Sequence, residues 1–330
     1  MLPYPFLVLH ADWSAALAKR WIGRATLRAD GRFYAEQPRR VEQAASLLAD
    51  LIKHVGASGA ALVGFDIPIG LPLAYARRAG IHDFIRILPE LGKGSWSTFY
   101  QPALTPDEIS HLRPFYPARP GGTRQQHLLE RLSVTSMNDL RRRCELAHQG
   151  RRAACPLFWT LGAQQVGKAA ISGWRQVLTG EDGILPNVSI WPFLGSLGEL
   201  IKPGHVVVAE TYPAEYYAHL GVRFSNRKRG ETSGKRSQAD RAANAAALLE
   251  FSTRVGISLT PSLEGEILDG FGPTPEAEDR FDAVVGLFGM LNVVLGDRPP
   301  GEPENEDIRK IEGWILGQEW YAPDCQIEEK

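Results

Sequence analysis

Three short apolar runs, each followed by an acidic residue, are the clearest pattern along the chain. The runs that precede Asp12, Asp66 and Glu210 contain five or six mostly apolar residues. Runs of this length without polar alternation are typical of strands that are buried on both faces of a sheet. The sequence therefore predicts three strands that each end at a carboxylate, and the strand before Asp66 is expected to be buried.

The segments around these runs predict a hairpin and several helices. Two alternating segments, residues 20–27 and 32–35, flank the turn-forming dipeptide Asp30-Gly31 and indicate a β-hairpin. Elsewhere apolar residues recur every three or four positions, which is the spacing of an amphipathic helix. The strongest helices of this kind are expected at residues 39–55, 237–255 and 276–295.

The order of these elements predicts an α/β fold that carries a long insertion. Residues 1–72 and 200–297 contain the regular strand and helix patterns, and we assign them to one core. Residues 73–199 are rich in Pro, Gly, Trp and Arg, and we assign them to a mostly helical insertion. Residues 298–330 begin with a Pro- and Glu-rich stretch, which predicts a linker before a C-terminal helix. Helices within the insertion are expected near residues 76–88, 124–150 and 163–178.

The composition is typical of a soluble protein with a substantial core, since 44% of the 330 residues are hydrophobic. No apolar run approaches the roughly 18 residues needed to cross a bilayer, and no secretory signal pattern is present, so we expect neither membrane insertion nor secretion. The three cysteines lack the spacing of a metal site. Their number and spacing indicate a reduced, cytoplasmic protein.

The net charge of −1 gives no overall sign of nucleic-acid binding, but the charges are unevenly distributed. Residues 113–152 contain nine Lys or Arg against three Asp or Glu, and residues 223–241 contain seven against two. From residue 262 to the end the balance reverses, with five basic and seventeen acidic residues. This asymmetry permits a basic surface for an anionic partner, and solvated helix faces would give the same pattern.

The carboxylates at the strand ends are the first candidates for chemistry. Ligands of α/β sheets bind at the carboxyl ends of the strands, so Asp12, Asp66 and Glu210 are expected to face one crevice. Carboxylates gathered there lose hydration and repel one another, and a divalent cation offsets both costs. A single Asp at a strand end also commonly caps a turn or helix. The three acids together favour a metal site.

A further acid is expected from the helix at residues 276–295. Asp282 lies on the same helix face as Gly286 and Gly289, which follow it by four and seven residues. Glycine lowers helix stability, so two glycines on one face indicate close packing against another backbone. We therefore predict that Asp282 points inward, whereas Asp279 lies further round toward solvent and suits a helix N-terminus.

Several of these segments together resemble one protein family. They are the strand before Asp12, the stretch Phe65-Asp-Ile-Pro-Ile-Gly-Leu-Pro, the stretch Glu210-Thr-Tyr-Pro-Ala-Glu, a downstream Lys/Arg cluster and Asp279-Arg-Phe-Asp-Ala. In order and spacing, over residues 5–295, they are similar to a family of predicted nucleases with a ribonuclease H-like fold, the domain of unknown function 429.

The resemblance implies a ribonuclease H-like mixed sheet flanked by helices, with a nuclease site at its edge. Asp12, Asp66 and Asp282 would be catalytic acids that bind two Mg²⁺ or Mn²⁺ ions for hydrolysis of a phosphodiester. Glu210 would be a fourth catalytic acid. The proline and glycine residues that follow Asp66 would hold its backbone rigid.

The same resemblance supplies candidates for substrate binding. The family's conspicuous lysine corresponds to Lys228 or Lys235, and either one is a candidate point charge on phosphate. Gln164 falls where the family tends to carry a glutamine. Ser14 is expected either to cap the turn after the first strand or to contact phosphate.

Three other polar residues have alternative interpretations. Glu210 either faces the metals or pairs with Lys228 or Arg241 in a supporting ion pair. His10, within the first strand, is expected to be a core or hydrogen-bonded histidine rather than a ligand. Glu215 is expected to be a surface residue of a short helix.

The leading hypothesis is a metal-dependent nuclease that acts on nucleic acid or another phosphorylated substrate, with the insertion covering the site. One alternative is a non-catalytic scaffold that binds nucleic acid or protein through the Arg-rich insertion. Another is a phosphotransferase with an actin-like fold. That fold would need a glycine-containing phosphate loop after the first strand, where this chain has Asp12-Trp-Ser.

Overall fold

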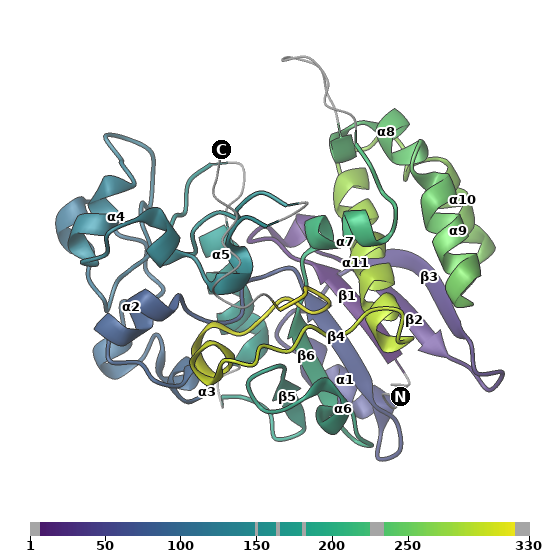
Figure 1. Cartoon of the computed structure of the whole chain (residues 1–330), viewed down its shortest axis with the longest axis horizontal. Helices are drawn as coiled ribbons and strands as arrows, with labels where there is room; N and C mark the ends of the chain where they lie inside the picture. The colour runs from purple at the N-terminus through teal and green to yellow at the C-terminus, as the bar shows by residue number, and fades with distance from the viewer. Residues whose placement is uncertain (1–6, 149–150, 163–165, 180–182, 225–233, 321–330) are drawn as a thin grey trace.

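A seven-stranded mixed sheet forms the centre of the fold, in the order β5-β6-β4-β1-β2-β3-β7 (Figure 1). The computed structural model describes residues 7–148, 151–162, 166–179, 183–224 and 234–320. Strand β2 is antiparallel to β1 and β3, whereas β5, β6, β4 and β1 all run parallel to one another. The strands are β1 (Leu7–Asp12), β2 (Trp21–Leu27), β3 (Phe33–Arg40), β4 (Ala61–Phe65), β5 (Val188–Ile190), β6 (Val206–Glu210) and β7 (Ser258–Leu259).

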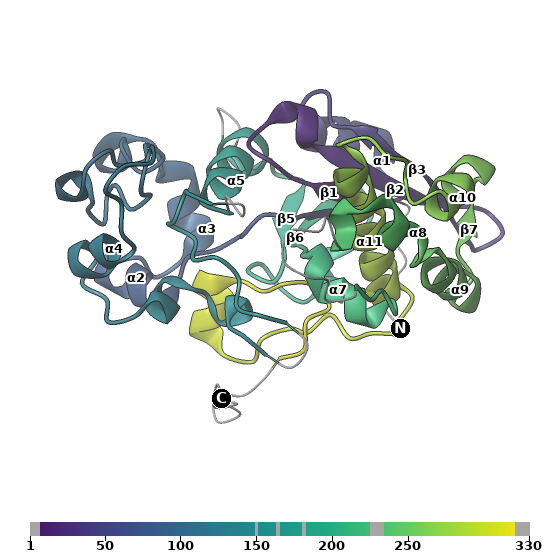
Figure 2. The ribbon, with the colours of Figure 1, turned by 90° about the horizontal axis from the view of Figure 1, so that it is seen from above.

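Helices cover both faces of this sheet, and Figure 2 shows α1 and α7 on opposite sides of β1. Successive side chains of a strand point to opposite faces. Leu7 and Leu9 of β1 accordingly pack with α1 and the insertion, whereas Val8 packs with α7, α9, α10 and α11. The helices are α1 (Leu47–Val55), α2 (Leu73–Arg78), α3 (Phe84–Ile87), α4 (Gln126–Arg131), α5 (Val166–Gly173), α6 (Leu197–Leu200), α7 (Pro213–His219), α8 (Gln238–Ala242), α9 (Ala245–Val255), α10 (Pro261–Leu268) and α11 (Ala277–Val294).

The structure confirms the three predicted strands that end in carboxylates and the hairpin of β2 and β3. The insertion, on the left of Figure 1, contains α2 to α5 together with many short turns. Its aromatic side chains, among them Phe84 and Trp174 with ring centroids 5.1 Å apart, belong to the same hydrophobic cluster as Leu7 and Leu9 of the sheet. The insertion and the sheet therefore share one core.

Two of the predicted boundaries are wrong. The sequence predicts an insertion over residues 73–199, but β5 lies inside that range and forms an edge of the sheet, next to β6. The start of 298–330 is expected to be a linker, but this stretch packs on the rest of the fold, where Glu302 Oε1 accepts a bond from Leu197 N at 2.7 Å. A strand of three residues and a segment without periodicity give too little local pattern to be recognised.

Three helices also differ from their predicted extent. The helix expected at 39–55 begins only at Leu47, because β3 continues to Arg40. The helix expected at 237–255 is divided into α8 and α9 at Asn244, whose side chain bonds both the N–H and the carbonyl of Arg223. The C-terminal helix is a single π-helical turn, Ile308–Glu312.

The glycine face of α11 is closely packed, as predicted, but chiefly against side chains rather than backbone. A Cβ atom on Gly286 would lie 2.1 Å from the ring of His10, and one on Gly289 would lie 2.2 Å from the ring of Tyr216. Both distances are shorter than any van der Waals contact. Two glycines are therefore required for α11 to approach β1 and α7.

We expect Gly286→Ala to lower the free energy of unfolding by about 1–3 kcal/mol, because the added methyl group must displace His10 or shift α11. Gly265→Ala is the matched control, since Gly265 is also helical, in α10, and a Cβ there would meet nothing within 4 Å. That variant should be unchanged or more stable by up to about 1 kcal/mol, through helix propensity. Chemical denaturation measures both, and equal effects would contradict this packing.

Candidate functional site

Asp12 and Asp66 lie side by side at the carboxyl ends of two adjacent parallel strands. Ala11 of β1 pairs with Phe65 of β4, and Asp66 N donates to Ala11 O at 3.0 Å. The next residues in register are therefore the two aspartates. Glu210 ends β6 on the other side of β4, where it pairs with Phe65. The sheet thus places the three predicted carboxylates at one edge.

Asp282 approaches this edge from α11. The helix is fixed over β1 by the contact of Gly286 with His10, and His10 Nδ1 lies 3.2 Å from Ala283 O, within hydrogen-bond distance. Asp282 is buried, with 2% of its surface exposed, and Asp279 is only partly buried. The predicted orientations of these two acids are confirmed.

The carboxylates of Asp12 and Asp66 carry an unfavourable charge. Burial, followed by the nearby charges of Asp282 and Asp66, raises the pKa of Asp12 well above its ordinary value. Burial, together with the charge of Asp282, raises the pKa of Asp66 to about 7. In the part of the chain that the structure describes, no group donates a hydrogen bond to either carboxylate. Two adjacent desolvated carboxylates without a donor are costly unless a cation joins them.

Both oxygens of Asp282, by contrast, have partners. The hydroxyl of Tyr217, on α7, donates to Oδ1 at 2.7 Å, and the ammonium of Lys235 donates to Oδ2. Lys235 Nζ also lies 3.1 Å from Oε1 of Glu278. Burial works against the charged ammonium, but the charge of Asp282 outweighs it and raises the pKa of Lys235. Lys235 therefore supplies the positive charge next to Asp282.

The donor set fits a hard divalent cation. Across the described ranges no three His, Cys, Asp or Glu side chains are arranged as a set of metal ligands. Mg²⁺ does not require such a set, because it commonly binds one or two carboxylates together with waters and substrate phosphates. Asp12 and Asp66 supply two carboxylates of the kind it prefers.

Glu210 belongs to a buried ion pair. Its two carboxylate oxygens each accept a hydrogen bond of 2.5 Å from the guanidinium of Arg142, which is fully buried. Arg142 also bonds the carboxylate of Glu145 and the carbonyl oxygens of Ile69 and Glu312. Ile69 N in turn donates to Glu210 Oε2 at 2.7 Å. This network fixes the turn that follows Asp66.

Of the alternatives for Glu210, the pair with Arg241 is wrong. Arg241 donates instead to the backbone carbonyls of Lys235, Gly270 and Gly272. Arg142, the actual partner, had no distinguishing signal in the sequence, since it stands in a run of three arginines within an irregular stretch.

The remaining predicted residues are placed as follows. Ser14 is in the turn after β1, where its Oγ accepts a bond from Ala16 N at 3.3 Å. Glu215 was expected at the surface, but it is buried and its Oε2 accepts a bond from Arg151 at 2.8 Å. Gln164 and Lys228 lie outside the described residues.

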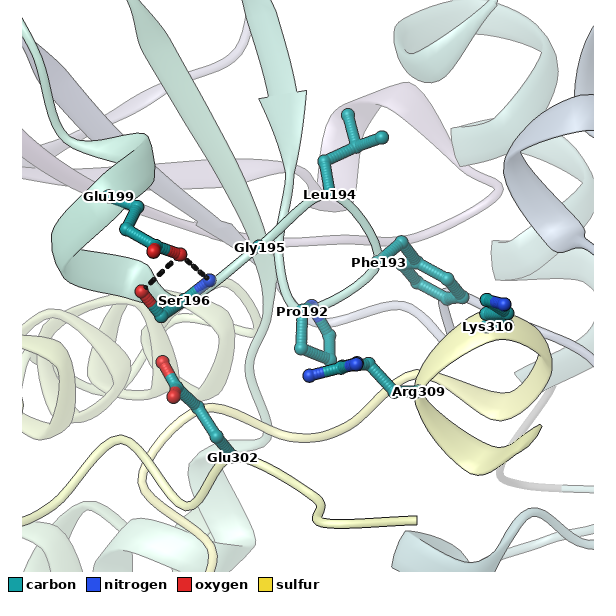
Figure 3. A pocket seen from close by; sticks show the side chains of 9 residues that line it. All are labelled: Pro192, Phe193, Leu194, Gly195, Ser196, Glu199, Glu302, Arg309 and Lys310. Atoms are coloured by element: carbon teal, nitrogen blue, oxygen red, sulfur yellow. Dashed lines mark hydrogen bonds between the residues drawn. The ribbon is translucent and has the colours of Figure 1, made fainter. Parts of the chain in front are cut away.

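A pocket of 340 Å³ lies between the segment after β5 and the C-terminal π turn (Figure 3). None of the predicted site residues lines it. Its two carboxylates serve the local structure: Glu199 accepts bonds from the N–H and hydroxyl of Ser196, and Glu302 accepts one from Leu197 N. The pocket is therefore separate from the acidic site.

His10 is a buried core histidine, as predicted, and it gives the protein a specific pH dependence. Burial lowers its pKa from 6.5 to about 3. Between these values the unfolded chain binds the proton and the folded chain does not, so stability is lost as the pH falls below 6.5. We expect this residue to account for about 2 kcal/mol of lost stability between pH 7 and pH 5.

The measurement compares wild type with His10→Asn, which retains a donor for Ala283 O but does not titrate. Unfolding free energies are determined at pH 7 and pH 5 for both proteins. The wild type should lose more stability than the variant. An equal loss of unfolding free energy in the two proteins would show that His10 binds its proton equally well in the folded and the unfolded chain.

Comparison with family models, with curated proteins and with solved structures found no match for this chain. A search of the described helices found none that is long and apolar enough to span a membrane.

Proposed function

We propose that this protein is a divalent-metal-dependent hydrolase of phosphodiesters, with the metal held by Asp12 and Asp66. One observation carries the proposal: two adjacent carboxylates at strand ends, Asp12 buried and Asp66 half-buried, receive no hydrogen bond from any described residue. A bound Mg²⁺ or Mn²⁺ ion removes the repulsion between them. Such an ion would supply a Lewis acid and an activated water for attack on phosphorus.

The sheet order supports a ribonuclease H-like assignment of the fold. The antiparallel strands β3, β2 and β1 are followed by the parallel strands β4 and β6. The acids come from the ends of the first and fourth strands and from a late helix, α11, that packs on β1. This is the arrangement that the family resemblance implies for a nuclease.

The protein's own residues would orient the substrate. The Lys235 ammonium lies beside Asp282, where it provides a point charge for a phosphate oxygen. The Arg142–Glu210 pair holds the turn after Asp66, which keeps the ligand oxygens in place.

The test is a cleavage assay with single-stranded DNA, duplex DNA and RNA, in Mg²⁺, in Mn²⁺ and in EDTA. Cleavage of one class that requires the metal is the expected result. Salt-dependent binding without cleavage in any metal would instead favour a non-catalytic nucleic-acid-binding role. If the protein neither binds nor cleaves any of the three substrates, that result would contradict the nuclease proposal.

A further inference from the structure

The backbone around Lys235 fixes the position of its ammonium group beside Asp282. Lys235 lies in a 3-10 turn, Gly234–Arg236, that leads directly into α8. The turn is fixed at both ends, since Gly234 N donates to Asp240 Oδ2 at 2.9 Å and Arg241 donates to Lys235 O at 2.5 Å. The backbone therefore holds the ammonium close to Asp282.

Both oxygens of Asp282 already have a partner. A hydroxyl donates to Oδ1 and an ammonium donates to Oδ2, so a cation that used the remaining lone pairs would lie beside the positive charge of Lys235. Asp12 and Asp66 have no such partners among the described residues. The site is thus divided into an open pair of carboxylates and a carboxylate that is already neutralised.

The charges balance with a single ion. Asp12, Asp66, Asp282 and Glu278 together carry four negative charges when ionised, and the two cations that contact them, Lys235 and Arg236, supply two positive charges. One divalent cation supplies the other two. A second ion on Asp282 would lie against the Lys235 ammonium, which is repulsive at hydrogen-bond distance.

We infer that the site takes one divalent ion, on Asp12 and Asp66, and that the Lys235 ammonium takes the place of a second ion beside Asp282. The inference rests on the proposed function and deepens it. The resemblance implies two ions, whereas the Lys235 ammonium on Asp282 favours one.

The experiment counts bound Mn²⁺ per chain, by calorimetry and by the electron paramagnetic resonance signal of free Mn²⁺. The full-length wild type should bind one ion. Lys235→Met frees Asp282 and should raise the count to two. Arg236→Met is the matched control, because Arg236 is the adjacent cation and contacts Glu278 but not Asp282; it should still bind one.

A second variant keeps the test decisive if Lys235→Met does not fold. Asp282→Asn should still bind one ion, though more weakly, because Asp282 is not a ligand but its charge neutralises Lys235. Two ions in the wild type, or loss of an ion in Asp282→Asn, would overturn the inference and leave the proposed function standing. One ion at unchanged affinity in folded Lys235→Met would also overturn it. No ion in the wild type would contradict the proposed function itself, and the inference with it.

Discussion

Arg142→Met is expected to lower the free energy of unfolding by about 3–5 kcal/mol. The guanidinium is fully buried and bonds Glu210, Glu145 and two backbone carbonyls. Removal of one partner leaves the carboxylates of Glu210 and Glu145 buried without their counter-charge, and methionine cannot donate to the freed oxygens. Denaturation in urea or guanidinium measures the loss.

The matched control is Arg86→Met. Arg86 also pairs with an acid three residues away, Asp83 at 3.6 Å, but 89% of its side chain is exposed. Exposed pairs contribute about 0–1 kcal/mol, so the control should be nearly neutral. The double variant Arg142→Met/Glu210→Gln should lose less than the sum of its parts, because it no longer leaves Glu210 charged and unpaired. Equal losses in Arg142→Met and Arg86→Met would contradict the assigned role of the buried pair.

Asp12→Asn is expected to abolish measurable metal binding. Asparagine keeps the size of the side chain but removes the negative charge that a hard cation requires. Loss of a group that merely supports a ligand costs about 10–100-fold in affinity, and loss of a ligand should exceed that range. Calorimetric titration with Mn²⁺ measures it, and metal-dependent cleavage should disappear in parallel.

The same variant should be at least as stable as the wild type. Burial and the neighbouring acids raise the pKa of Asp12, so its ionised form opposes folding at neutral pH. Lost binding together with an unchanged or higher unfolding midpoint therefore excludes unfolding as the cause. Asp279→Asn removes a nearby acid that is not a proposed ligand, and it should retain binding. Unchanged binding in Asp12→Asn would contradict the assignment.

The sheet edge was predictable because its signals are local. Apolar runs before Asp12, Asp66 and Glu210 show where strands end, and parallel strands bring their ends together. The position of Asp282 followed from two glycines on its helix face. The structure changes the reason for those glycines, since they accommodate the rings of His10 and Tyr216 rather than another backbone.

The partners of these acids were not predictable in the same way. Arg142 reaches Glu210 across 68 residues, and Tyr217 reaches Asp282 across 65. Neither contact produces a repeating pattern in the sequence, because each depends on how the insertion or α7 packs in three dimensions. Runs of Lys and Arg in the sequence indicated that basic side chains were available. Only the fold determines which basic side chain pairs with which acid.

A crystal soaked in Mn²⁺ and measured for anomalous scattering tests the central claim most directly. We expect one peak, bound by carboxylate oxygens of both Asp12 and Asp66 at about 2.0–2.5 Å. We also expect Lys235 to remain on Asp282. A fully soaked crystal without a peak at Asp12 and Asp66, or with a peak elsewhere only, would contradict the metal site and the function built on it.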